Sequence, residues 1–347
     1  IATEKGLLIG EVPLLPIQKW FFENNFVTPN HWNQSFIIKT PSLDAERLQI
    51  SIAKLIDHHD AFRLTYKKAK DAGRHTQHYV STMAEKLRVL DINSLAAKEG
   101  SEEFDFKLQK VFTDWQSVFD IEKGPLYSVG YIHGYADGSS RVYFALHHLI
   151  VDGVSWRILA EDLQTLYSGK ELREKGSSYR QWVKAVEHYG GNSEEEKSYW
   201  TEFASEYKDD PLRKLASCDA HKNYKSIQLS KEQTKQLLQR SNKTYNTQIN
   251  DLLLTALGHS LSEITRTSRN YILLEGHGRE EISSNIDVTR TIGWFTTMYP
   301  VKLEVGTAIG ESIKMVKENL RSIPNKGIGY GATLGYKPEA LPSVSFN

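Results

Sequence analysis

The sequence predicts an α/β protein made of two lobes, each a mixed sheet with helices packed on it. Segments with the period of a strand alternate with segments with the period of a helix in both halves of the chain. The 347 residues are long for a single hydrophobic core and sufficient for two. Residues 169–178 are charged and contain Gly and Ser, so we expect the lobes to divide there, into residues 1–175 and 176–347.

Hydrophobic periodicity and turn residues define the elements expected in the N-terminal lobe. Pro16 suits the first turn of a helix, because a missing N–H costs nothing there. Apolar residues fall on one helical face between Ala45 and His58. Residues 126–134 and 142–146 predict two strands that pair as a hairpin through 136–139. Further strands are expected at 31–38, 63–66, 78–80 and 88–92, and a further helix at 104–119.

The C-terminal lobe shows the same alternation. Ser230 and Gln233 form a capping box at the start of one helix. Thr247 is placed to cap a longer helix, in which apolar residues recur at helical spacing. Strands are expected at 226–229 and 270–274. Helices are expected at 179–189, 193–204 and 309–320, and the helix at 309–320 is the last one expected in the chain.

Charge and cysteine content limit the classes of function. The 43 basic and 43 acidic residues cancel without forming a basic stripe, so we expect neither nucleic acid nor a membrane as partner. No apolar run has the length of a transmembrane helix, and the N-terminus lacks the layout of a signal peptide. Cys218 is the only cysteine, which fits a reducing, cytoplasmic setting. We expect it to be structural rather than a nucleophile.

The stretch Arg141–Trp156 contains the strongest indication of chemistry. A run of strand-forming residues ends in the pair His147 and His148, and Asp152, Gly153 and Ser155 follow. Neighbouring side chains of a strand point to opposite faces, so one histidine should face a cavity and the other should be packed. We expect Ser155 to cap a helix that runs to Tyr167, and its N-terminal dipole to disfavour the charged form of a nearby imidazole.

Three further stretches, and a second His pair, contain residue types that are common in functional sites. Glu275-Gly-His-Gly-Arg-Glu follows an apolar strand and places a carboxylate at its end, although a polar turn is the plainer interpretation in isolation. Residues 287–300 contain aromatic side chains that either wall a tunnel or belong to a core. Residues 323–331 predict a glycine-rich bend rather than a dinucleotide site. The second pair, His58-His59-Asp60, ends a helix and is interpreted as structural.

Six stretches, taken in order, give the chain a family resemblance. They are Pro16-Ile-Gln-Lys-Trp-Phe, His147-His-Leu-Ile-Val-Asp-Gly-Val-Ser-Trp, Asp251-Leu-Leu-Leu-Thr-Ala-Leu-Gly, Glu275-Gly-His-Gly-Arg-Glu, Arg290-Thr-Ile-Gly-Trp-Phe-Thr-Thr-Met-Tyr-Pro and Pro324-Asn-Lys-Gly-Ile-Gly-Tyr-Gly. The set resembles the signature of the epimerization domains of nonribosomal peptide synthetases, within the condensation-domain superfamily, whose fold is similar to chloramphenicol acetyltransferase. Condensation domains share the His pair but usually lack the Glu-Gly-His-Gly-Arg-Glu block.

The resemblance implies two chloramphenicol-acetyltransferase-like lobes that form a V, with the active site in a channel between them. It also implies that the chain, which ends at Val344-Ser-Phe-Asn347, stops where the family's next block begins, so that the C-terminal lobe is incomplete. The implied reaction is inversion of the α-carbon of an aminoacyl or peptidyl thioester. That thioester is held on the phosphopantetheine of an upstream peptidyl carrier domain of the same polypeptide, with further synthetase modules downstream, in the biosynthesis of peptide antibiotics. The domain itself binds no cofactor.

The resemblance assigns a role to each site residue. His148 and Glu275 are the acid/base pair, and Trp294, Tyr299 and Asn347 are expected to bind substrate. The expected supporting residues are His147, Asp152, Gly153 and Arg279, with Asp152 structural and pairing with Arg279. Donors for the thioester oxygen are expected from backbone N–H groups near Gly153 or from Asn347.

Three alternatives remain open at this point. The first is a condensation domain that joins two carrier-bound substrates. The second is a catalytically silent domain that only docks carriers. The third is a metal enzyme that uses His147, His148 and Asp152, although alternating side-chain directions in a strand make joint ligation awkward.

Overall fold

Two compact units make up the chain, and each contains its own sheets and core. In the computed structural model, the described residues are 1–69, 74–83, 86–207, 211–216, 223–241 and 245–347. Unit 1 comprises residues 1–188 and 281–296, and unit 2 comprises residues 189–280 and 297–347. Cys218, which the sequence analysis interpreted as structural, lies outside the described residues.

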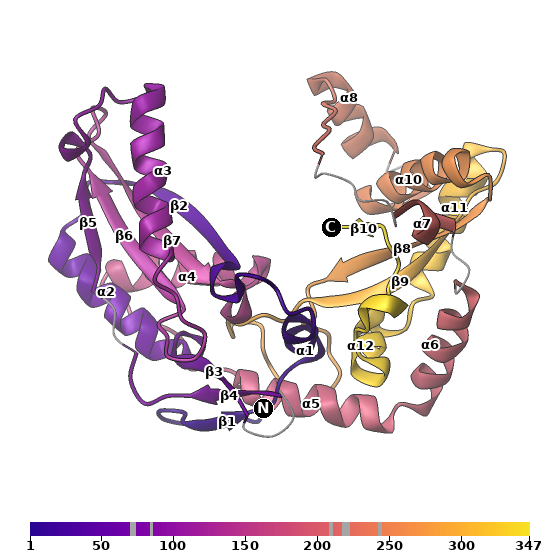
Figure 1. The fold of residues 1–347 in the computed structure, drawn as a ribbon, viewed down its shortest axis with the longest axis horizontal. Coiled ribbons are helices and arrows are strands. Elements are labelled where there is room, and N and C mark those ends of the chain that lie inside the picture. Colours follow the sequence, from indigo (N-terminus) through magenta and orange to yellow (C-terminus); the bar gives the residue numbers. More distant parts are fainter. Residues whose placement is uncertain (70–73, 84–85, 208–210, 217–222, 242–244) are drawn as a thin grey trace. The chain divides into compact units, whose positions relative to one another are not determined.

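Unit 1 contains a four-stranded mixed sheet of order β2-β7-β6-β5 and a three-stranded antiparallel sheet of order β1-β4-β3 (Figure 1). Its strands are β1 (Gly10–Val12), β2 (Asn33–Pro41), β3 (Leu64–Lys68), β4 (His75–Tyr79), β5 (Arg88–Asp91), β6 (Tyr127–His133) and β7 (Ser139–His147). Its helices are α1 (Pro16–Glu23), α2 (Ala45–His58), α3 (Glu102–Gln116), α4 (Gly153–Tyr167) and most of α5 (Tyr179–Asn192).

Strand β7 is buried on both faces, because helices cover the four-stranded sheet on both sides. On one face the ring of Tyr143 stacks on Phe112 of α3, with the ring centroids 4.3 Å apart. The next residue, Phe144, points the other way and stacks on Phe36 of β2, which in turn contacts Trp156 of α4. The fully buried strand carries the His pair at its end, so packing on both faces fixes where that end lies.

Unit 2 is built on the mixed sheet β10-β8-β9, in which β8 pairs antiparallel with β9 and parallel with β10. Helices α10 and α11 pack on β8 and β9, and α12 packs on β9 and on α6 (Figure 1). The remaining bounds are α6 (Glu194–Glu206), α7 (Pro211–Ala216), α8 (Lys231–Gln236), α10 (Ile249–Thr265), β8 (Arg269–Gly276), β9 (Thr297–Glu304), α11 (Ile309–Arg321), α12 (Ile328–Leu334) and β10 (Ser345–Phe346). The predicted fold class, mixed sheets with helices packed on them in both halves, is confirmed.

The predicted division of the chain near residue 175 requires correction, since the units divide within α5 and the later segment 281–296 belongs to unit 1. Helix α5 continues without a break, and its buried residues pack in unit 1, where the Tyr179 hydroxyl donates to the Trp294 carbonyl at 2.7 Å. The Ser177 N–H donates to the carbonyl of Asp287 at 2.7 Å, so the charged stretch is packed against segment 281–296 instead of forming a linker. These contacts are non-local, and a shift in composition cannot indicate them.

Several local expectations also need correction. Ser226–Leu229 is not a strand, and residues 223–230 belong to no regular element. The glycine-rich segment near 323–331 is not only a bend, because it contains a short 3₁₀ helix, η6 (Pro324–Gly327), and then α12. Helix α10 is capped at Gln248 and not at Thr247. The capping box of Ser230 and Gln233 is confirmed. Among the described residues, no helix is long and apolar enough to cross a membrane.

Candidate functional site

The His pair lies where β7 ends and the chain turns into α4. His147 is the last residue of β7, and His148 begins a short 3₁₀ helix, η4 (His148–Ile150). The backbone N–H of His148 donates to the carbonyl of Trp32 at 2.9 Å. Residues 149–151 are fully buried. The polypeptide therefore passes through the core between the histidines and the helix, and this fixes the position of both rings.

His147 is completely buried, and both of its ring nitrogens are occupied. Its Nδ1 accepts from the N–H of Leu149 at 3.1 Å, so the proton sits on Nε2, which donates to the Pro29 carbonyl at 2.7 Å. Burial lowers the pKa of His147 to about 4. This geometry disfavours the metal-enzyme alternative, because neither ring nitrogen is available to a metal without breaking a buried hydrogen bond.

Acid should destabilise unit 1 through His147. The folded-state pKa of about 4 lies below the ordinary 6.5, so the folded chain binds fewer protons than the unfolded chain between these values. The stability contribution is therefore present above pH 6.5 and is lost as the pH falls toward 4. We expect it to fall by about 2–3 kcal/mol between pH 7.5 and 4.5. In urea titrations at both pH values, His147→Asn should show a correspondingly smaller loss, and an equal loss in both proteins would contradict the assignment.

His148 is partly buried and is held at both ring nitrogens. Nδ1 lies 3.0 Å from the carbonyl oxygen of Val151, and Nε2 lies 2.8 Å from the side-chain nitrogen of Gln34. The Trp294 ring packs on the imidazole with the two centroids 4.4 Å apart. Burial lowers the pKa of His148, and the hydrogen bonds and Asp152 oppose this effect. The direction agrees with the sequence-based expectation, but the leading cause is burial and not the helix dipole.

Asp152, and not Ser155 as the sequence suggested, is the N-cap of α4. One carboxylate oxygen accepts from the N–H and the hydroxyl of Ser155 at 2.8 and 2.7 Å, and the other accepts from the N–H of Phe295 at 3.1 Å. Asp152 therefore joins the turn after the His pair to segment 281–296. Gly153 begins α4, is exposed, and has open space where a side chain would stand. A ligand can thus approach the backbone closely at this residue.

Segment 281–296 places Trp294 beside His148. Ser155 fixes the preceding residue, because its hydroxyl bonds both the N–H and the carbonyl of Gly293 at 3.1 Å. A Cβ on Gly293 would lie 2.6 Å from the ring of Tyr179, so only glycine fits there. Trp294 is almost fully buried, and its indole N–H has no acceptor among the described residues. A buried donor without an acceptor is costly, which makes this N–H a candidate for bonding a ligand.

In unit 2, Glu275 lies on β8, and Asn347 directly follows β10, the neighbouring parallel strand. Glu275 precedes the last residue of β8, and β10 pairs with β8 so that Ser345 is opposite Leu273 and Phe346 opposite Leu274. Asn347, next in this register, forms a side-chain hydrogen bond with Glu275. Although the Glu275 side chain keeps solvent exposure, surrounding protein raises its pKa, and the bond from Asn347 partly offsets this rise. The carboxyl is thus adjusted toward proton transfer at higher pH than an ordinary glutamate.

The residues that follow Glu275 form a polar loop. His277 accepts from the N–H of Arg279 through Nδ1 at 3.0 Å, and its Nε2 lies 3.2 Å from the carboxylate of Glu280. Lys326 bonds the other oxygen of Glu280 at 3.1 Å. Tyr299 is partly buried, and a Cβ on Gly327 would lie 2.1 Å from its ring, so glycine at 327 is required for this packing. The glycine-rich stretch therefore provides the space in which the Tyr299 ring packs, a role that the sequence did not indicate.

The structure thus gathers the predicted site residues into two groups. His147, His148, Asp152, Gly153 and Trp294 belong to unit 1. Glu275, Arg279, Tyr299 and Asn347 belong to unit 2. The pairing of Asp152 with Arg279, which would join the two units, stays a prediction.

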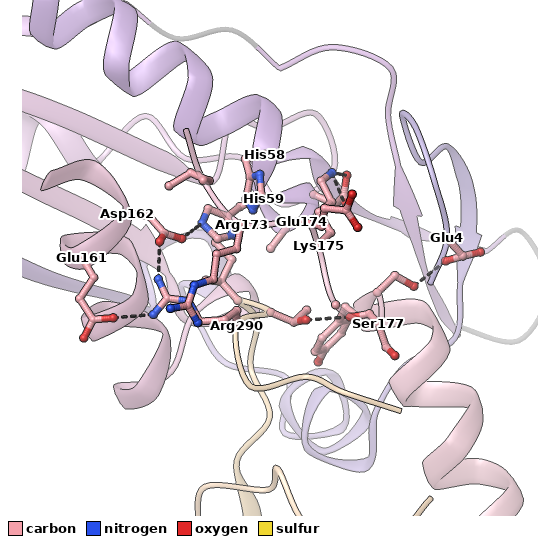
Figure 2. Close-up of a pocket in the computed structure, with 18 of the residues that line it drawn as sticks. Glu4, His58, His59, Glu161, Asp162, Arg173, Glu174, Lys175, Ser177 and Arg290 are labelled. Atoms are coloured by element: carbon pink, nitrogen blue, oxygen red, sulfur yellow. Dashed lines mark hydrogen bonds and ion pairs between the residues drawn. The ribbon is translucent and has the colours of Figure 1, made fainter. Parts of the chain in front are cut away.

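A separate pocket of about 350 Å³ lies within unit 1, and several of its charged groups are paired with one another (Figure 2). His59 bonds Asp162 at 2.9 Å, and Arg290 bonds both Glu161 and Asp162. The donor atoms of His58, His59 and Asp162 lie within 4.8 Å of one another, as in a metal site. The Arg290 guanidinium on Asp162 opposes a divalent cation there.

The second His pair, His58 and His59, lines this pocket. Burial first, and then the neighbouring His59 and Lys175 side chains, lower the pKa of His58 to about 4. Lys175 bonds Asp60 at 3.0 Å, which links the charged stretch to the short 3₁₀ helix η2 (Asp60–Arg63) that follows α2. The groups around the pocket hold unit 1 together.

Comparison with known proteins gives the family of the chain. The model of the family described as Condensation domain matches residues 9–337, and the chain belongs to this family. The predicted membership of the condensation-domain superfamily is confirmed.

Among relatives, the chain is 42% identical over 352 residues to N-(5-amino-5-carboxypentanoyl)-L-cysteinyl-D-valine synthase of Amycolatopsis lactamdurans, with 99% of this chain and 9% of that protein covered. The chain therefore spans about a tenth of the length of such relatives. Among solved structures, it is similar to the epimerization domain from the third module of tyrocidine synthetase B, at 34% identity and a TM-score of 0.78, covering 99% of this chain and 80% of that one. The first condensation domain of the calcium-dependent antibiotic synthetase shares the fold at 17% identity and a TM-score of 0.73, covering 93% and 76%.

Proposed function

We propose that the chain inverts the α-carbon of an aminoacyl or peptidyl thioester held on the phosphopantetheine of a carrier domain, by removing the α-proton and returning one to the opposite face. The observation that carries the proposal is the pair of adjusted proton-transfer groups, an imidazole held neutral at His148 and a carboxyl with raised pKa at Glu275. The likeness to the epimerization domain of tyrocidine synthetase B, at 34% identity, supports it.

The two groups meet the chemical demand of the reaction. When the α C–H bond breaks, its electron pair moves into the thioester carbonyl and forms an enolate, while the proton passes to the basic member of the pair. The other member then gives a proton to the opposite face of the α-carbon. Burial lowers the pKa of His148 and raises that of Glu275, so each pKa is shifted toward the ordinary value of the other group.

The enolate oxygen also needs hydrogen-bond donors. We assign this role to the indole N–H of Trp294, which is buried beside His148 and has no acceptor among the described residues. The backbone at Gly153, which a ligand can approach, is the second donor in this proposal. A preorganised donor of this kind contributes about 3 kcal/mol to the stability of an oxyanion. The Asn347 amide is instead engaged with Glu275.

The test uses a carrier domain loaded with an L-aminoacyl thioester and no acceptor. After incubation with the chain and hydrolysis of the thioester, chiral chromatography should find both the L and the D residue on the carrier. A condensation domain would leave the L residue unchanged and form a peptide bond only when a second loaded carrier is added. That result would replace the proposal with its first alternative.

A further inference from the structure

Gln34 contacts the imidazole of His148 from a strand on which the sequence indicated no function. It lies near the start of β2, where Gln34 is opposite Leu146 and Asn33 is opposite His147 of β7. This register brings its side chain to the end of the His-pair strand. The partly buried Gln34 amide touches two other groups, the indole of Trp156 and the imidazole of His148.

The indole of Trp156 fixes which way the Gln34 amide points. An indole N–H can only donate, and it lies 2.9 Å from Oε1 of Gln34, so this atom must be the amide oxygen. The amide nitrogen then faces Nε2 of His148 at 2.8 Å. An amide nitrogen can only donate, and Nε2 of His148 must therefore accept with its lone pair.

The contact of the other ring nitrogen of His148 independently indicates the same tautomer. Nδ1 lies 3.0 Å from the carbonyl oxygen of Val151, which can only accept, so Nδ1 carries the proton. Both contacts specify one neutral tautomer, with the proton on Nδ1 and the lone pair on Nε2. If Nε2 carried the proton, its N–H would face the N–H of the Gln34 amide, and two donors would oppose each other.

We propose that Gln34 is a positioning residue which, held by Trp156, sets the tautomer of His148 and keeps its imidazole uncharged until substrate arrives. This inference rests on the proposed function only for its catalytic consequence. As the substrate enters, Gln34 gives up one hydrogen bond, and the Nε2 lone pair becomes the basic end of the ring. The loss of one hydrogen bond is small beside the gain from a base in the correct form.

The charged neighbours of His148 do not keep its imidazole in the neutral form. Asp152 favours the protonated ring, and His147 is neutral at ordinary pH. The remaining groups packed on the ring, Gln34, Trp294 and Trp32, carry no charge. Gln34 is therefore the neighbour whose replacement by a matching charged side chain should alter the protonation of His148 most directly.

Nuclear magnetic resonance of the histidine side chains tests the inference without substrate. In the unaltered chain labelled with ¹⁵N-histidine, the His148 signals, identified by their loss in His148→Ala, should be those of the Nδ1–H tautomer at pH 7.5. The variant Gln34→Glu places a carboxylate where it accepts from both Trp156 and a protonated Nε2. The titration midpoint of His148 should rise by about one to three pH units, as it does beside an opposite charge. Gln34→Met, of similar size but without a donor, is the control and should not raise it to that extent.

Two outcomes would overturn the inference. One is an Nε2–H tautomer of His148 in the unaltered chain, which needs no variant and so does not depend on folding of a mutant. The other is a folded Gln34→Glu chain whose His148 midpoint matches that of Gln34→Met. If the unaltered chain shows the Nδ1–H tautomer but inverts no thioester, the proposed function fails while the assignment of Gln34 stands. If inversion occurs, its pH–rate limb should move in Gln34→Glu by the same amount as the midpoint.

Discussion

Replacing His148 with alanine, or Glu275 with glutamine, is expected to lower the rate of α-carbon inversion by about 10²- to 10⁴-fold, the usual contribution of a positioned acid or base. Alanine removes the imidazole that Val151 and Gln34 hold in its neutral form. Glutamine keeps the size of Glu275 and its contact with Asn347, but it cannot transfer a proton. The measurement is the rate at which the D residue appears on a carrier loaded with the L residue.

Two variants control for general damage. His58→Ala removes an imidazole from the second His pair, and Glu281→Gln removes an exposed carboxylate six residues after Glu275. Both should keep the inversion rate within about twofold, as surface and peripheral changes usually do. If His148→Ala and Glu275→Gln also inverted at the unaltered rate, the pair would not be the acid and base. If no version of the chain inverted the thioester, the silent carrier-docking alternative would gain support.

The largest expected effect on stability comes from Asp152→Ala. The change removes a buried carboxylate that accepts three hydrogen bonds, and it leaves the N–H groups of Ser155 and Phe295 without this partner. Each unsatisfied buried group costs about 1–3 kcal/mol, so we expect the free energy of unfolding of unit 1 to fall by about 3–5 kcal/mol. Urea titration followed by tryptophan fluorescence measures this, because Trp294 and Trp156 lie near the altered turn.

Asp152→Asn is the matched variant. Its amide oxygen can still accept from Ser155, but its amide nitrogen opposes the N–H of Phe295. We expect a smaller loss, about 1–2 kcal/mol. Equal losses in the alanine and asparagine variants would show that the bonds to Ser155 contribute little, and the account of Asp152 as the N-cap of α4 would then be wrong.

The parts of the fold that local patterns determine were predicted well. Helix α2 has the predicted bounds, because its apolar face and its capping residue Asp44 are both local signals. The β6–β7 hairpin was also predicted, from two strand-like runs around a turn. Strand β9 was missed, because its residues Thr297–Glu304 include Pro300 and follow an aromatic run that was interpreted as either a tunnel wall or part of a core. Packing against α10 and α11 decides its structure, and such long-range contacts leave no local period.

For the site, the sequence indicated the ends of the strands but not the groups that adjust them. His148 and Glu275 follow apolar runs, which is a readable signal. Gln34 has no such signal, since it contacts His148 only through the register of β2 with β7, more than a hundred residues along the chain. The donor role proposed for Trp294 rests on its indole N–H, which has no acceptor among the described residues, and no local sequence pattern indicates this. Asp152 and Ser155 are both good N-cap residues, and the sequence alone led to Ser155. The structure assigns the N-cap to Asp152, whose carboxylate also accepts from the N–H of Phe295.

The most direct test of the account is the hydrogen isotope at the α-carbon after a single turnover in D₂O. A carrier loaded with an L-aminoacyl thioester is mixed with the unaltered chain without any acceptor, and the released residue is analysed for both chirality and mass. The account predicts that the D residue forms and carries one deuterium at its α-carbon. An L residue that keeps its α-hydrogen throughout, from a chain that forms a peptide bond once a second loaded carrier is supplied, would contradict it.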